Sequence, residues 1–366
     1  RPQFVAVDNY QAVTKWAAMV PFADQVPTLL RRAFTYLRTG RPGPVLLEVP
    51  SDVIFEQFDD KLFEYSPVRG WKPAGDPGDV RRVAEALIAA ENPIIRAGNG
   101  VLYAGAWAEL RELAELLQIP VFTTMQGKSA FPESHPLSLG TGGRTRPKAV
   151  MHFLNKADLV FAIGSSCTRE GYTTNLPRGK TLIQSTIDEI DIGKDYPVAE
   201  AIVGDAKLVL QQLIDEVKRQ SGPSRRDGAA TAKEIAAVKG EWIAEWLPRL
   251  TSDELPINPY RVIWDLNKML DKGKTIVIPE SGGPRDQSVP FYEADVPGGF
   301  VGWGKTTTLA GSLGFAMGAK LANPDKTVVN IMGDASVGMG GLDFETAVRE
   351  GIPIFTIVLN NGRFAG

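Results

Sequence analysis

Residues 331–366 read IMGDASVGMGGLDFETAVREGIPIFTIVLNNGRFAG, and their pattern indicates the fold class. The apolar run Val328–Met332 predicts a buried strand that is followed by a glycine-rich turn. The apolar spacing over Leu342–Glu350 predicts a helix, and Ile354–Leu359 predicts a second buried strand. Two apolar strands joined by a helix indicate a parallel βαβ unit, and therefore an α/β fold.

Polar residues follow both expected strands, Asp334 after the first and Asn361 after the second. Open parallel sheets bind ligands at the edge where their strands end, so both side chains are expected at one pocket. A carboxylate and an amide oxygen are hard ligands suited to Mg²⁺, which commonly completes its shell with phosphate oxygens. The adjacent helix N-terminus would favour a diphosphate. The alternative is an ordinary nucleotide-fold edge with an Asp helix cap and an Asn-Gly turn.

The order GDAS, helix, LNN resembles the diphosphate motif of thiamine diphosphate (ThDP) enzymes, and GDAS…ETAVREGIP…IVLNN looks most like the acetolactate synthase branch. The resemblance implies that Mg²⁺ is held by the side chains of Asp334 and Asn361 and by the backbone carbonyl of Arg363. It also implies cofactor contacts at Gly333, Ala335 and Ser336.

The composition excludes several classes of protein. The 366 residues suit two or three α/β domains, and their 40 basic and 43 acidic side chains give a net charge of −3, so neither nucleic acid nor a membrane is an expected partner. The single cysteine, Cys167, fits a reducing cytoplasm. His135 and His152 are expected on loop or helix surfaces rather than in catalysis. The chain begins without Met and stops soon after Arg363, so segments are expected to be missing at both ends.

Residues 1–70 resemble the C-terminal part of the pyrimidine-binding domain of ThDP enzymes, through TKWAAMVPFADQ and GRPGPVLLEVPSDV. The apolar spacing over Val26–Leu37 predicts a helix, and the run Val45–Val49 predicts a buried strand. In this family the domain carries the catalytic glutamate, at a position that would lie upstream of residue 1. The catalytic acid–base residue is therefore left unassigned.

Residues 79–217 predict a doubly wound parallel α/β domain, because apolar strands alternate with amphipathic helices. Asp79 is expected to cap the first helix. The expected strands are Pro93–Arg96, Val121–Thr124 and Leu159–Ile163. This segment resembles the central domain of ThDP enzymes.

In some members of the family the central domain binds FAD or ADP, and an arginine commonly lies two residues after a strand-ending glycine. Here Gly164 is followed by Ser165-Ser166, so FAD is not expected. The turn at Gly98-Asn99-Gly100 fits either a dinucleotide phosphate or tight helix–strand packing.

A polar linker is expected over 218–232, and residues 233–366 resemble the diphosphate-binding domain of ThDP enzymes. The predicted strand Thr275–Ile278 ends at Glu280-Ser281-Gly282. By resemblance this turn would help to hold the diphosphate, and the alternative is a plain loop.

The helix predicted over Thr308–Leu321 is rich in small residues, which indicates a close approach to its backbone. Its sequence GSLGFAMGA resembles the segment that cradles the aminopyrimidine ring of ThDP. The resemblance implies that the Gly311 carbonyl accepts from the 4′-amino group, and that Leu313 donates its N–H to the ring and wedges its side chain beneath the thiazolium. The alternative is a helix packed tightly on a sheet. The preceding GWGKTTTLA departs from the acetolactate synthase pattern and leaves the substrate open.

Residues Gly299–Thr306 also match the P-loop pattern G-x-x-x-x-G-K-[ST]. A P-loop needs a buried strand directly before it, but residues 292–298 are polar and broken by proline. We therefore expect an accidental match, with Lys305 a solvated loop residue.

Three functions are compatible with the sequence. The first is a ThDP- and Mg²⁺-dependent 2-oxo acid decarboxylase or carboligase, a homodimer or homotetramer with its active site at the subunit interface. The second is the same machinery acting on an acyl-CoA substrate, as a 2-hydroxyacyl-CoA lyase or oxalyl-CoA decarboxylase. The third is a P-loop nucleotide hydrolase or a silent nucleotide-binding subunit.

Overall fold

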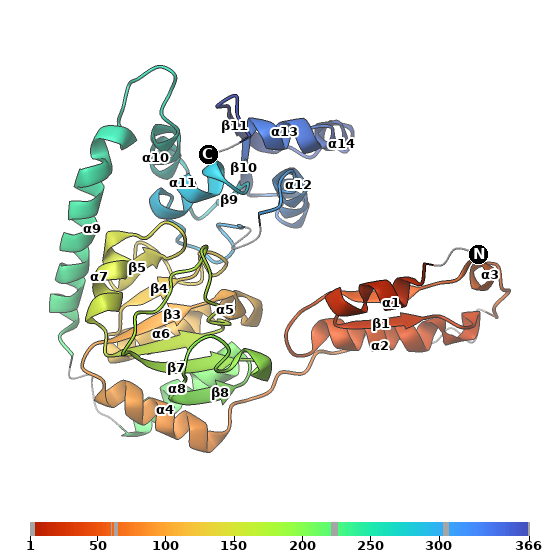
Figure 1. The fold of residues 1–366 in the computed structure, drawn as a ribbon, viewed down its shortest axis with the longest axis horizontal. Helices are drawn as coiled ribbons and strands as arrows, with labels where there is room; N and C mark the ends of the chain where they lie inside the picture. Colours follow the sequence, from red (N-terminus) through yellow and green to blue (C-terminus); the bar gives the residue numbers. More distant parts are fainter. Residues whose placement is uncertain (1–3, 60, 62–64, 221–225, 303–306, 365–366) are drawn as a thin grey trace. The chain divides into compact units, whose positions relative to one another are not determined.

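The computed structural model describes residues 4–59, 61, 65–220, 226–302 and 307–364. The chain forms two units, Arg1–Ala74 and Gly75–Gly366, and each is described by itself (Figure 1). None of the described helices combines the length and the apolar character that crossing a bilayer requires.

The first unit contains two short parallel strands and an amphipathic helix. Its elements are α1 (Ala6–Tyr10), η1 (Gln11–Val13), β1 (Trp16–Met19), η2 (Ala23–Gln25), α2 (Val26–Arg38), β2 (Val45–Glu48) and α3 (Ser51–Ile54). The Trp16 ring of β1 stacks on Tyr36 of α2, with the ring centroids 5.4 Å apart. The helix prediction is confirmed, but β2 is only half-buried, because a two-stranded sheet covers little surface.

The second unit begins with a six-stranded parallel sheet in the order β5-β4-β3-β6-β7-β8. The strands are β3 (Pro93–Ala97), β4 (Val121–Thr123), β5 (Ser138–Thr141), β6 (Leu159–Ile163), β7 (Thr181–Thr186) and β8 (Glu200–Val203). The strand order changes direction between β3 and β6, so the predicted doubly wound topology is confirmed. β6 is buried along its whole length, in agreement with its continuous apolar sequence.

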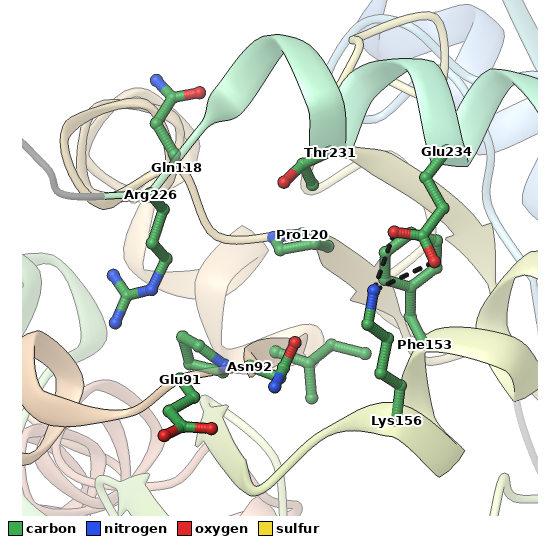
Figure 2. Close-up of a pocket in the computed structure, with 11 residues that line it drawn as sticks. Glu91, Asn92, Gln118, Pro120, Phe153, Lys156, Arg226, Thr231 and Glu234 are labelled. Carbon is green, nitrogen blue, oxygen red and sulfur yellow. Dashed lines mark hydrogen bonds and ion pairs between the residues drawn. The ribbon is translucent and has the colours of Figure 1, made fainter.

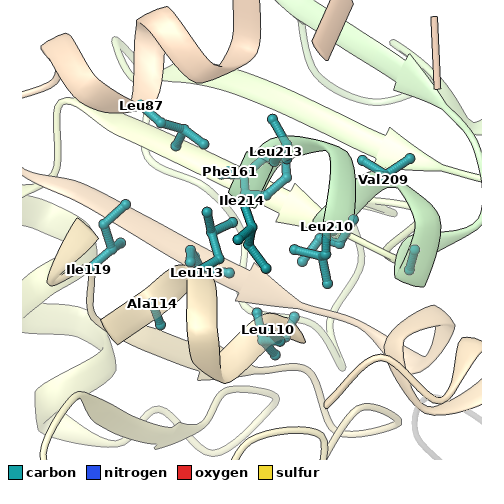
Figure 3. Close-up of a cluster of buried hydrophobic side chains, with 14 of the residues drawn as sticks. Leu87, Leu110, Leu113, Ala114, Ile119, Phe161, Val209, Leu210, Leu213 and Ile214 are labelled. Carbon is teal, nitrogen blue, oxygen red and sulfur yellow. The ribbon is translucent and has the colours of Figure 1, made fainter. Parts of the chain in front are cut away.

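Helices cover both faces of this sheet. They are α4 (Pro77–Ala89), α5 (Asn99–Ala104), α6 (Trp107–Leu117), α7 (Lys148–Lys156), the short η4 (Glu189–Asp191) and α8 (Ala206–Gln220). On one face Leu87 of α4, Leu110 of α6 and Leu213 of α8 share a buried cluster with Phe161 of β6 (Figure 3). On the other face α7 contributes to a second cluster.

Several details of this domain differ from the predictions. Asp76, not Asp79, caps α4: its carboxylate accepts the N–H groups of Gly78 and Asp79 at 2.8 and 3.1 Å. Pro77 at the start of α4 favours this earlier beginning, because its fixed φ suits the first helical turn. The sequence did not predict α5, β5, β7 or β8. β7 was not predicted because its second half, Gln184 to Thr186, is polar although it is buried.

The predicted linker is shorter than expected, since α8 continues to Gln220 and α9 begins at Gly228. α9 runs from Gly228 to Leu250. Its Ile235 joins the second cluster of the six-stranded sheet, and its Trp242 packs with the core of the next sheet. α9 therefore connects the two sheets of this unit (Figure 1).

A three-stranded parallel sheet follows, in the order β11-β10-β9. Its strands are β9 (Thr275–Pro279), β10 (Thr327–Gly333) and β11 (Phe355–Leu359). The helices around it are α10 (Pro259–Met269), α11 (Gly283–Phe291), α12 (Ser312–Ala322), α13 (Asp334–Gly340) and α14 (Asp343–Arg349). The parallel βαβ unit predicted from residues 331–366 is confirmed.

Three predictions about this sheet were wrong in detail. β11 is partly exposed rather than buried, because it is the outermost strand of the sheet that the structure describes. The expected glycine-rich turn after β10 is the helix α13, which starts at Asp334 with extended Gly333 as its N-cap. α12 begins at Ser312 rather than Thr308.

A buried ion pair ties the two sheets of this unit together. Lys128 follows β4 and binds the carboxylate of Glu133, and its ammonium also donates to the Val289 carbonyl of α11 at 3.1 Å. Glu133 accepts the N–H of Ala294 at 2.9 Å. The segment after α11 is thereby fixed before it passes beside β9, where Phe300 bridges Val277.

Candidate functional site

The carboxyl ends of three parallel strands define the candidate site. In the sheet register Gly333 pairs with Leu359 and Ile331 pairs with Pro279. Asp334 therefore follows β10 at the same edge where Asn360 and Asn361 follow β11 and where Glu280 follows β9. The arrangement is the one that open parallel sheets use to bind ligands.

Asp334 is the first residue of α13 and is half-buried. Its Oδ1 accepts the N–H of Ala335 at 2.9 Å, and Ser336 in the same turn is buried. A carboxylate at the N-terminus of a helix is stabilised by the helix dipole. Its remaining oxygen lone pairs suit a cation at the strand end.

The loop after β11 is shaped by two asparagines. Asn360 Oδ1 accepts the N–H of Gly362, and Asn361 Oδ1 accepts the N–H of Arg363, each at 3.0 Å. Gly362 has a φ of +63°, a conformation that favours glycine. These Asx turns bring the backbone of Arg363 beside the amide oxygen of Asn361.

The donor set at this edge fits Mg²⁺ chemically. It offers a carboxylate from Asp334, an amide oxygen from Asn361 and the backbone carbonyl of Arg363, all hard oxygen ligands. Within the part of the chain that the structure describes, no group of three or more His, Cys, Asp or Glu side chains could hold a metal. An ion at this edge would complete its shell with water or with oxygens of a ligand.

The turn after β9 contains a buried carboxylate. Glu280 has 0% exposure, and its two carboxylate oxygens accept the N–H groups of Ser281 at 3.1 Å and of Ser312 at 3.2 Å. Gly282 has a φ of +85°, so a side chain at this position would be strained. α11 begins at Gly283 and directs its first N–H groups toward the same strand end.

The start of α12 holds the two residues assigned to the aminopyrimidine ring. Gly311 is the N-cap, and its carbonyl accepts the N–H of Phe315 at 3.1 Å, which leaves one oxygen lone pair. Leu313 is fully buried. A Cβ added to Gly314 or Gly318 would meet no heavy atom of the described chain within 4 Å. The glycines of α12 therefore do not pack on the sheet, whereas Ala316 of the same helix does, in a cluster with Ile276 and Val328.

α13 and the start of α12 are in direct contact. A Cβ added to Gly340 would lie 2.7 Å from the Ala310 Cβ, so only glycine fits there without a shift. Ala310 itself has a φ of +68°, which is uncommon for a residue with a side chain. The helix that begins with Asp334 is thus held against the segment that contains Gly311.

Sequence reasoning missed one charged residue beside the site. Arg285 lies in the first turn of α11 and is 2% exposed, with its Nε 2.9 Å from Asp286 Oδ1. Its guanidinium carbon lies 5.1 Å from the ring centroid of Tyr172, and that of Arg144 lies 5.6 Å from the same ring. No motif marked Arg285, although a cation in the first turn of a helix at a strand end is unfavourable unless it has a local role.

The glycines at the carboxyl ends of β3 and β6 pack on each other. The N–H of Gly100 donates to the Gly164 carbonyl at 2.9 Å, and a Cβ added to Gly98 would lie 2.2 Å from the same oxygen. This contact favours the packing interpretation of the Gly98–Gly100 turn. Burial raises the pKa of Cys167 after β6, so its thiol is poorly suited to act as a nucleophile.

The P-loop interpretation lacks its structural context. Residues 292–298 form no strand, and Phe300 bridges Val277 at the edge of the sheet. Gly304, Lys305 and Thr306 lie outside the described residues.

Two family models match the chain. The thiamine pyrophosphate enzyme central domain matches residues 80–213, and the C-terminal TPP binding domain of the same family matches residues 284–365. Together they span more than half of the sequence. The matched residues include Asp334 and Asn361.

The chain is also similar to proteins with assigned names. It is 30% identical to the probable acetolactate synthase large subunit of Methanococcus aeolicus, over 97% of this chain and 62% of that protein. It is 29% identical to the acetolactate synthase isozyme 3 large subunit of Escherichia coli, over 97% of this chain and 62% of that protein. The chain thus spans about three fifths of the length of these relatives. It belongs to the thiamine pyrophosphate enzyme family and is acetolactate synthase-like.

Proposed function

We propose that the chain is part of a ThDP- and Mg²⁺-dependent enzyme that decarboxylates a 2-oxo acid and transfers the remaining fragment to a second carbonyl compound. One observation carries the proposal: Asp334 and Asn361 follow adjacent parallel strands at the same edge of one sheet. The acetolactate synthase names of the relatives support a carboligase rather than a simple decarboxylase.

The roles of the site residues follow from their chemistry. Asp334, Asn361 and the Arg363 carbonyl would hold Mg²⁺, and the ion would neutralise part of the diphosphate charge. Backbone N–H and hydroxyl groups of the two strand-end turns would bind the remaining phosphate oxygens, apart from the N–H groups of Ala335 and Ser281, which donate to Asp334 and Glu280. These turns comprise Gly333, Ala335 and Ser336 after β10, and Ser281 and Gly282 after β9. When bound, ThDP supplies the electron sink that the decarboxylation of a 2-oxo acid requires.

The start of α12 would orient the other end of the cofactor. The free lone pair of the Gly311 carbonyl suits the 4′-amino group, and Leu313 would donate its N–H and support the thiazolium ring. The open glycine face of α12 leaves room for a flat ring or for another chain. We propose a cytoplasmic homo-oligomer whose site is completed by a second subunit. Phe315 and Leu321, 49% and 68% exposed on α12, are apolar side chains that such a contact would cover.

Calorimetric titration with ThDP tests the proposal. We expect binding in the presence of MgCl₂ and its loss when EDTA removes the ion. Equal affinity with and without Mg²⁺ would contradict the proposed metal site, and an absence of binding under both conditions would contradict the cofactor.

A further inference from the structure

We propose that Glu280 is a positioning residue, whose carboxylate fastens the start of α12 to the end of β9. It would thereby fix the Gly311–Leu313 segment relative to the diphosphate turn. The inference rests on the proposed function and assigns Glu280 a role different from direct contact with the cofactor.

A buried glutamate carboxylate is energetically unfavourable at this position. It is completely buried, and both hydrogen bonds to its carboxylate come from backbone N–H groups. Within the described part of the chain it forms no ion pair with a lysine, arginine or histidine. Burying a carboxylate without a cation is unfavourable, so its hydrogen bonds must compensate for the lost hydration.

The hydrogen bond from the Ser312 N–H to Glu280 caps the N-terminus of α12. Ser312 is the first residue of α12, and its N–H has no acceptor within the helix. The N-cap, Gly311, has no side chain that could accept it. Glu280, 32 positions earlier in the sequence, takes the place of a local cap. Its negative charge lies at the positive end of the helix dipole.

Glu280 is itself held in place by the central strand. Its backbone N–H donates to the Ile331 carbonyl of β10 at 2.7 Å. The chain of contacts therefore runs from β10 through Glu280 to Ser312, which lies between Gly311 and Leu313. The two groups expected to bind the aminopyrimidine ring are thus tied to the strands whose ends would hold Mg²⁺ and the diphosphate.

The negative charge of Glu280 also makes direct contact with the diphosphate unfavourable. A carboxylate repels phosphate oxygens, and this one is directed to N–H groups of the protein. In the turn after β9, Ser281 and Gly282 are left as the diphosphate-binding residues. The indirect role is our proposal in place of the cofactor contact predicted for Glu280 from the sequence.

The test compares Glu280→Ala and Glu280→Gln with Asp205→Ala as a matched control. Asp205 is also a buried carboxylate at a helix start, since it accepts the N–H of Lys207 at 3.1 Å, but it belongs to α8 of the other sheet. Two quantities are measured in each variant: the Kd of ThDP with Mg²⁺ by calorimetry, and the amide hydrogen exchange rate at Ser312 without cofactor.

We expect Glu280→Ala, which removes both carboxylate hydrogen bonds, to accelerate exchange at Ser312. It should weaken ThDP binding about 10- to 100-fold, the effect of losing the charge-assisted hydrogen bond that holds Ser312. Glu280→Gln keeps one acceptor oxygen, which can still reach the Ser312 N–H, but it replaces the other oxygen by an NH₂ donor and removes the charge. Its loss of affinity should therefore be smaller than that of Glu280→Ala, about 3- to 10-fold. Asp205→Ala should lower thermal stability without changing either quantity.

Several results would overturn the inference. Glu280→Ala would contradict it by showing a wild-type Kd for ThDP or an unchanged exchange rate at Ser312. So would a loss of ThDP affinity in Asp205→Ala or in Glu280→Gln as large as that in Glu280→Ala. If Glu280→Ala does not fold, the ThDP affinity and the Ser312 exchange rate of Glu280→Gln test the inference, and wild-type values of both would overturn it. If wild type fails to bind ThDP, the proposed function fails, whereas the exchange measurement still tests the tie to α12.

Discussion

The contact between α13 and the start of α12 allows a sharp prediction for Gly340→Ala. The added Cβ would lie 2.7 Å from the Ala310 Cβ and 3.0 Å from its carbonyl oxygen. Carbon atoms in proteins prefer separations of about 3.5–4.0 Å, so one segment must move by close to 1 Å. Overpacking of this kind costs about 1–3 kcal/mol, and the helix propensity gained from alanine offsets at most about 1 kcal/mol of it.

Gly338→Ala in the same helix is the matched control, because a Cβ there would meet nothing within 4 Å. It should stabilise the protein by about 0.5–1 kcal/mol, whereas Gly340→Ala should destabilise it by about 1–2 kcal/mol. Thermal unfolding followed by circular dichroism gives the two shifts, which should have opposite signs. Gly340→Ala should also weaken ThDP binding, since it displaces the helix that begins with Asp334. Equal, favourable shifts in both variants would refute the contact.

Three further predictions concern single side chains. Asp334→Ala should abolish Mg²⁺-dependent ThDP binding in calorimetry, and unchanged affinity would count against the metal site. Leu313→Ala should lower turnover more than ThDP affinity, and wild-type turnover would refute the wedge role. Burial raises the pKa of Tyr292 to about 12, so the folded state favours its neutral form. Its contribution to stability should be complete below the unfolded pKa of about 10 and be lost as pH rises toward 12. Tyr292→Phe should remove the highest tyrosine step from an absorbance titration, and a titration that is unchanged would disprove the assignment.

The sequence predicted strands best where both faces of a strand are buried. β6 and β10 are covered on both faces, so their apolar runs predicted strands with nearly correct ends. The start of α10 also has a local signal, because Asn258 before Pro259 caps it by accepting the N–H of Tyr260 at 3.0 Å. The GDAS and LNN motifs marked the strand ends, and both sit at one sheet edge.

The remaining features depend on contacts between distant residues. β7 was not predicted because its polar side chains are buried through long-range hydrogen bonds, such as the one from Gln184 to the Ser165 carbonyl. The glycines of GDASVGMGG suggested a turn, but α13 forms because Gly333 caps it and Gly340 packs on Ala310. No local pattern reveals that the Glu280 carboxylate reaches Ser312, since 32 positions separate them.

The proposed site requires that oxygens of Asp334 and Asn361 bind one divalent ion together with the diphosphate of ThDP. Replacing Mg²⁺ by Mn²⁺ in crystals grown with ThDP allows the ion to be located by anomalous scattering. We expect one peak within about 2.5 Å of both side-chain oxygens and of phosphate oxygens. A peak elsewhere, or ThDP bound with no ion at these residues, would contradict it.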